Sequence, residues 1–97
     1  MMFGKALQWV HQLTTQERIM SNKERFQTVL ADQYAQLFTL PAYAMSAARY
    51  TPTQLADKMT DGLLTGTAIK DGDGIKRTCK ALGIKHTYAA IKLFLQS

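Results

Sequence analysis

Apolar residues recur every three or four positions along most of the chain, which is the period of an amphipathic helix. No stretch of four or more residues shows the apolar–polar alternation of a half-buried strand. The pattern predicts six short helices, over about residues 2–13, 22–38, 41–49, 52–65, 74–82 and 86–95. The expected fold class is therefore all-α, a single compact domain of five or six short helices.

Several residues predict where these helices begin and end. Ser21 with Glu24 has the spacing of a capping box, and so has Thr51 with Gln54. Pro52 suits a first helical turn, and glycines 66 and 83 suit helix ends. The stretch GTAIKDGDG predicts a loop, in which its Asp-Gly pairs favour turns and positive φ and Asp73 caps the next helix.

One apolar face of each helix from residue 22 onward supplies the expected core. Its members are Phe26, Leu30, Tyr34, Leu37, Leu55, Met59, Leu63, Ile75, Leu82, Ile91 and Leu95. Cys79 is expected to be a small buried residue on the same face as Ile75, and Tyr88 to point inward. Each large side chain contributes roughly 1.5–3 kcal/mol when fully buried, so eleven make a sufficient core before chain entropy is subtracted.

The length of 97 residues fits one domain. Met20 is a plausible translation start, so residues 1–19 are interpreted as an N-terminal helix that is a dispensable extension, and residues 20–97 as the helical domain. We find no apolar run long enough to span a membrane and no signal peptide. With a single cysteine, these features predict a cytoplasmic protein.

Positive charge is concentrated near the C-terminus. The chain has 12 Lys and Arg against 7 Asp and Glu, a net charge of +5. Residues 69–97 hold six basic and two acidic side chains, which accounts for +4 of that total. The imbalance indicates an anionic partner, either nucleic acid or an acidic protein or nucleoprotein complex. The alternative is that these lysines only keep a small protein in solution.

The sequence contains none of the motifs that would indicate catalysis or a cofactor. The histidines, His11 and His86, lie far apart, and we find no zinc-binding helix, glycine-framed serine or phosphate-binding loop. The DGDG stretch lacks the third ligand and the distal glutamate of a calcium loop. We therefore expect neither an enzyme nor a bound metal or cofactor.

The stretch RTCKALGIKHTYAAIKLFL, residues 77–95, has a pattern that a function could use. Residues 75–95 resemble a helix-turn-helix, with Cys79 where the two helices cross and Gly83 in the turn. In this family the second helix enters the major groove of DNA. The resemblance implies a recognition helix that begins with Lys85, His86 and Thr87. It implies phosphate contacts from Lys76, Arg77 and Lys80, with Lys92 further along.

The segment also departs from that motif. Its turn is about one residue short, and Ala89 and Ala90 stand where recognition helices carry long polar side chains. Reading of a specific DNA site would also require a dimer. The alternative interpretation is an ordinary corner between two helices, with lysines facing water.

Two functions follow as hypotheses. The first is a small basic nucleic-acid-binding protein, such as a regulator encoded on a phage or plasmid. The second is an inhibitor or adaptor that docks on a host protein or nucleoprotein complex without catalysis, as anti-CRISPR proteins do. Trp9, Tyr43 and Tyr50 would be candidate anchors for such an interface.

Overall fold

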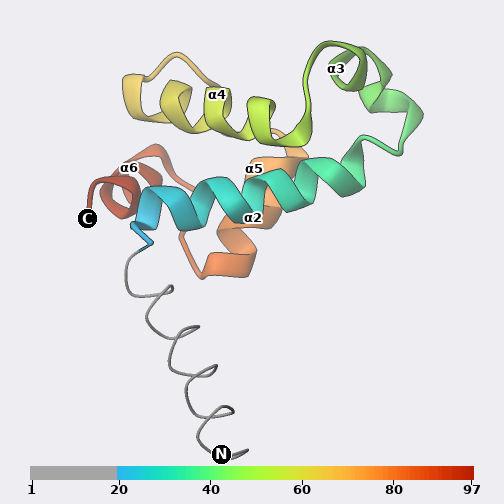
Figure 1. Ribbon diagram of the computed structural model, residues 1–97. Coiled ribbons are helices and arrows are strands. Elements are labelled where there is room, and N and C mark those ends of the chain that lie inside the picture. Colours follow the sequence, from blue (N-terminus) through green and yellow to red (C-terminus); the bar gives the residue numbers. More distant parts are fainter. Residues whose placement is uncertain (1–19) are drawn as a thin grey trace, which may run out of the picture.

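The structure is a computed structural model that describes residues 20–97, and every regular element in that range is helical (Figure 1). The elements are α2 (Asn22–Leu37), the 3₁₀ helix η1 (Pro41–Tyr43), α3 (Ala44–Arg49), α4 (Pro52–Thr65), α5 (Asp73–Leu82) and α6 (Tyr88–Gln96). The predicted all-α class is confirmed. The expected helix over residues 2–13, and with it Trp9 and His11, lies outside the described residues.

Helix α2 is the centre of the fold, because α4, α5 and α6 all pack against it (Figure 1). Its buried side chains are Phe26, Leu30, Tyr34 and Leu37, which recur at helical spacing as the sequence predicted. Leu63 of α4, Ile75 of α5 and Ile91 of α6 are fully buried against this row. Leu55, Met59 and Leu82, expected in the core, are only partly buried and pack at its margin.

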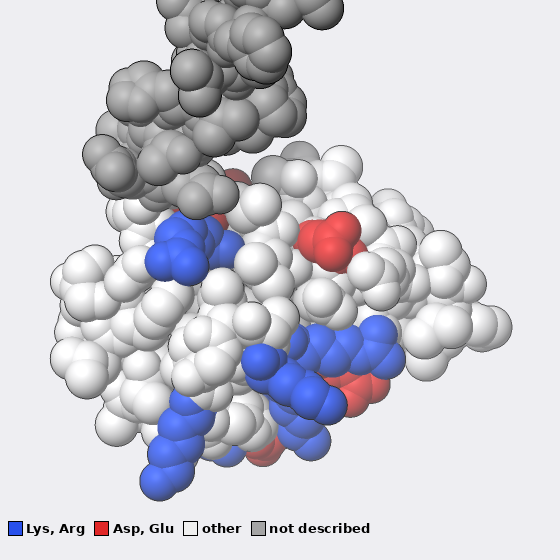
Figure 2. Space-filling view, turned by 90° about the horizontal axis from the view of Figure 1, so that it is seen from below, with Lys and Arg blue, Asp and Glu red and all other residues white. Residues whose placement is uncertain are grey.

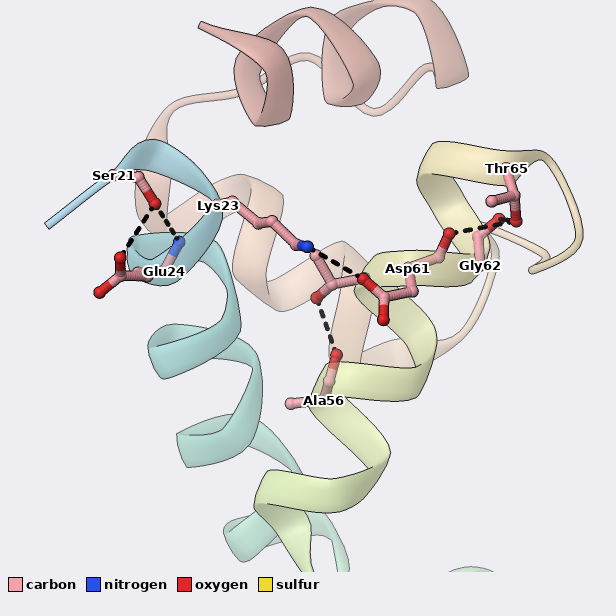
Figure 3. A network of polar contacts seen from close by, with 8 residues as sticks. Ser21, Lys23, Glu24, Ala56, Asp61, Gly62 and Thr65 are labelled. Atoms are coloured by element: carbon pink, nitrogen blue, oxygen red, sulfur yellow. Dashed lines mark hydrogen bonds and ion pairs between the residues drawn. The ribbon is translucent and has the colours of Figure 1, made fainter.

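The first turns of α2 and α4 are capped largely as predicted. The Thr51 hydroxyl accepts from the N–H of Gln54 at 3.1 Å, and the Gln54 amide oxygen accepts from the N–H of Thr51 at 3.0 Å. Ser21 accepts from the N–H of Glu24 at 3.1 Å, but the Glu24 carboxylate accepts from the Ser21 hydroxyl, so the reciprocal bond of a capping box is missing (Figure 3). An ion pair of 3.1 Å between Lys23 and Asp61 joins α2 to α4.

Glycine ends α4 and α5 as predicted. Gly66 and Gly83 have φ angles of +79° and +70°, in the left-handed region that other residues rarely adopt. The expectation of positive φ in the DGDG stretch was wrong, since among the described residues only these two glycines have it. Asp73 is not the cap of α5 either. The helix begins at Asp73 itself, and Gly72 occupies the N-cap without any side-chain bond.

The start of α6 also differs from the prediction. The helix begins at Tyr88 rather than near residue 86, because the hydroxyl of Thr87 caps it by accepting from the N–H of Ala90 at 3.1 Å. Tyr88 does not point into the core: 40% of it is exposed. Its hydroxyl instead bonds to the loop that precedes α5, as described below.

Residues 40–49, which we call the arm, extend beyond the end of α2 (Figure 1). None of them is buried, and Leu40 and Met45 are 46% and 72% exposed. The arm is anchored at its start by Tyr43, whose ring lies 6.4 Å from that of Phe38. At its end, Lys58 of α4 donates to the hydroxyl of Tyr50 at 2.8 Å.

Candidate nucleic-acid interface

Helix α5 has one buried face and one charged face. Ile75, Thr78 and Cys79 are buried, and the Thr78 hydroxyl is satisfied by donating to the carbonyl of Gly74 at 2.7 Å. Lys76, Arg77 and Lys80 are exposed on the other side. Lys80 follows Lys76 by four residues and Arg77 by three, the spacings at which side chains are neighbours on a helix. Three of the sequence-predicted site residues are thus brought together.

The cations of this region have no acidic partner within residues 20–97. The two ion pairs found there are Lys23–Asp61 and Lys70–Asp71. The side chains outside these pairs include Lys76, Arg77, Lys80, Lys85 and Lys92. Viewed from below, the molecule shows several blue side chains grouped together, with red side chains beside some of them (Figure 2). A surface of this kind attracts anions, and the attraction weakens as salt rises.

The remaining predicted site residues lie in or after the turn between α5 and α6. Lys85 is exposed, but His86 and Thr87 are partly buried and already bonded. The Nε2 atom of His86 lies 2.7 Å from the carbonyl oxygen of Lys70, and Thr87 caps α6. These three residues precede α6 instead of opening it, which corrects the arrangement that the helix-turn-helix resemblance implied.

Helices α5 and α6 both pack on α2 and have few close backbone contacts with each other. Cys79 is buried as expected, in a core to which α2, α4, α5 and α6 all contribute, and the few contacts between α5 and α6 do not form the crossing that the resemblance implied. The exposed residues of α6 include Ala89 and Leu93, which cannot donate hydrogen bonds to base edges, and Lys92 is partly buried. The pair is therefore closer to a helix corner than to a recognition unit.

The sequence predicted a loop between α4 and α5 but gave no sign of its contacts with Tyr88 at the start of α6. Lys70 lies in this loop, and its backbone N–H donates to the Tyr88 hydroxyl at 3.2 Å. Its ammonium group pairs with Asp71 at 2.9 Å. Hydrogen bonding and charge from Lys70 lower the pKa of Asp71, and the charges of His86 and Lys76 lower it further. Sequence spacing gave no signal of this grouping, because 18 residues separate Lys70 from Tyr88.

Within residues 20–97 we also looked for a reactive cysteine, a metal site and a membrane-spanning helix. Burial raises the pKa of the Cys79 thiol, which disfavours the reactive thiolate. Residues 20–97 contain no group of three or more His, Cys, Asp or Glu side chains placed to hold a metal ion. None of the helices in that range is long and apolar enough to cross a bilayer.

Comparisons with protein families, with curated proteins and with solved structures found no match to this chain. The functional argument therefore depends on the residues described above.

Proposed function

We propose that this protein binds nucleic acid through the charged face of α5 and the turn that follows it. The observation that carries the proposal is the group of exposed cations Lys76, Arg77, Lys80 and Lys85, which have no acidic partner within residues 20–97. An exposed cation without an acidic partner is available to contact a phosphate. Each such contact releases bound counterions from the nucleic acid, which favours binding.

The same observation argues against a purely solubilising role for these lysines. Elsewhere in residues 20–97, charged residues of both signs are interspersed, as on an ordinary surface, and Lys23 pairs with Asp61. On α5 the exposed residues include three cations and a single acidic residue, Asp73, so a net repulsion among the cations remains in the free protein. Phosphates would relieve that repulsion.

The test is binding to oligonucleotides, single-stranded and duplex, at several salt concentrations. We expect a dissociation constant near micromolar at low salt. For duplex DNA, the logarithm of the association constant should fall linearly with the logarithm of the salt concentration, by about 0.9 per phosphate contact. The triple variant K76A/R77A/K80A should bind more weakly and show a shallower slope. The matched control R25A/R49A/K58A removes the same charge from other helices.

The proposal is overturned if the unmodified protein fails to bind either nucleic acid at low salt. Equal losses in the two triple variants would also overturn it, because net charge rather than the α5 face would then govern binding. Circular dichroism should confirm that both variants keep the helical fold.

The arm supports a second candidate function, docking on a protein partner. Leu40 and Met45 are exposed although the core of residues 20–97 is complete without them. A photo-crosslinking residue at position 45 should capture one defined host protein, and Leu40→Asp should abolish this capture while K76A/R77A/K80A leaves it intact. Crosslinking that is equally strong from exposed position 57 of α4 would contradict this function.

A further inference from the structure

A second feature lies beside the charged face of α5, where the loop before α5 meets the start of α6. The Tyr88 hydroxyl accepts from the N–H of Lys70 at 3.2 Å and lies 3.3 Å from the carbonyl oxygen of Ala68, to which it can donate. His86 holds the same loop through the carbonyl of Lys70. We call Ile69, Lys70, His86 and Tyr88 the Tyr88 surface.

The ring of Tyr88 is not needed in the core. The hydroxyl makes the contacts with the loop, whereas 40% of the residue remains exposed and neighbouring Ile69 is 69% exposed. The Nζ atom of Lys70 lies 5.6 Å from the centre of the Tyr88 ring, within the range of a cation–π contact. An aromatic ring and an apolar side chain are thus presented next to an ammonium group.

Besides Lys70, further basic residues lie close to Tyr88 in the chain or near the loop that it holds. Lys70 pairs with Asp71 in the loop that Tyr88 holds, and the charge of Lys76 also lowers the pKa of Asp71. Lys92 follows Tyr88 by four residues on α6 and therefore lies on the same side of that helix. Lys85 is exposed in the turn just before it. The Tyr88 surface is therefore linked to the start of the charged face of α5 by the loop that contains Lys70.

We propose that the preferred ligand is single-stranded nucleic acid, with an unpaired base stacked on Tyr88 and the flanking phosphates held by Lys76 and Lys85. This inference rests on the proposed nucleic-acid binding and names the class of ligand. Every base presents a flat face that can stack on an aromatic ring, and a groove of cations beside such rings is the usual means of binding single strands.

The geometry disfavours a duplex as the better ligand. In a duplex the flat faces of the bases are covered by their neighbours, so Tyr88 would gain nothing from it. Reading the major groove needs long polar side chains along an exposed helix, and α6 exposes Ala89 and Leu93 instead. Duplex DNA would then bind only through its phosphates.

A purely structural role for Tyr88 makes a different prediction, because holding the loop requires the hydroxyl whereas stacking requires the ring. Tyr88→Phe removes the hydroxyl and keeps the ring. Tyr88→Leu removes both the hydroxyl and the aromatic face but keeps apolar bulk. Leu93→Ala is the matched control, since Leu93 is a 70% exposed apolar residue of the same helix.

The experiment measures fluorescence anisotropy of a labelled 12-nucleotide deoxythymidine strand and of a labelled 12-base-pair duplex, at low salt. We expect the single strand to bind more tightly. Tyr88→Leu and Tyr88→Ala should weaken single-strand binding by about tenfold, a typical loss for one stacked base, and leave duplex binding unchanged. Tyr88→Phe and Leu93→Ala should bind the single strand like the unmodified protein.

The outcomes separate this inference from the function on which it rests. If duplex binding is at least as tight as single-strand binding, or if Tyr88→Leu and Leu93→Ala behave alike, the stacking inference is wrong and nucleic-acid binding stands. A loss in Tyr88→Phe as large as in Tyr88→Leu would assign Tyr88 to holding the loop. If neither nucleic acid binds, the proposed function fails and this inference fails with it.

Discussion

Ile75 and Cys79 of α5 are buried, whereas Leu40 and Met45 of the arm are exposed, although α5 and the arm are both short segments of ten residues. In α5, Ile75 and Cys79 are at most 1% exposed and the charged residues face outward. In the arm, which holds no charge before Arg49, Met45 is 72% exposed. The sequence of α5 is explained by one buried face and one charged face, but folding of residues 20–97 does not explain the apolar content of the arm.

This difference also separates the two candidate functions. The charged face of α5 is fixed on a rigid support, since the helix packs against α2 through fully buried side chains. The arm makes few contacts with the other helices and is held mainly at its two ends. We therefore expect α5 to present its cations in one arrangement, and the arm to change position with little effect on the core.

The largest expected effect is the difference in stability loss between truncating a buried residue of α5 and truncating an exposed residue of the arm. Ile75→Ala removes a fully buried side chain, and we expect a loss of about 2–5 kcal/mol in the free energy of unfolding. Met45→Ala, at an exposed position of the arm, should change it by less than about 0.5 kcal/mol. Urea unfolding followed by circular dichroism measures both, and similar losses would contradict the comparison.

Gly74 sharpens the comparison within α5 itself. A Cβ atom at Gly74 would lie 2.6 Å from the Cε1 atom of the Tyr34 ring, so Gly74→Ala must displace a buried side chain. We expect a destabilisation of about 1–3 kcal/mol. Gly72→Ala is the control, because that position has negative φ and open space around it. Thermal unfolding that shifts equally in both variants would disprove the close contact of α5 with α2.

Tyr34 lies between the two regions, since it contacts Gly74 of α5 and its ring stacks 5.9 Å from that of Phe38, before the arm. Burial, with a smaller effect of Tyr43, raises the pKa of Tyr34 to about 12. The stability that the folded state gains from keeping the Tyr34 hydroxyl protonated is therefore fully present below pH 10, and it is lost as the pH rises toward 12.

At pH 12 this loss should approach roughly 2 kcal/mol, since each unit of pKa shift corresponds to about 1.4 kcal/mol. Tyr34→Phe cannot ionise, so the difference in unfolding free energy between the two proteins should be constant below pH 10 and change above it. A difference that stays constant up to pH 12 would show that Tyr34 ionises as readily in the folded state.

The smallest effect concerns the end of the arm. The hydrogen bond and charge of Lys58 lower the pKa of Tyr50, whose ring also lies 5.0 Å from the Lys58 ammonium group. Titration of the Tyr50 ring signals by NMR should give a midpoint below 10 that rises in Lys58→Met. An unchanged midpoint would mean that the arm is not held by this contact in solution.

The sequence by itself determined the helices of residues 20–97 and most of the core, because helical spacing, caps and terminal glycines act over a few residues. Thr51 with Gln54, and the glycines at 66 and 83, illustrate signals that neighbouring residues satisfy. Grouping of Lys76, Arg77 and Lys80 on one face of α5 follows from the same local geometry.

Only the tertiary structure decided the Tyr88 surface and the exposure of the arm. The spacing of Tyr88 from Ile91 and Leu95 predicts a core residue, but its hydroxyl bonds to the loop around Lys70, and 40% of the residue remains exposed. The sequence predicted Asp73 as the N-cap of α5, but the helix begins at Asp73 itself, one residue earlier than that prediction requires. The Tyr88 surface depends on contacts between residues far apart in the chain. The local pattern of apolar and polar residues does not show which distant residues become neighbours in the folded protein.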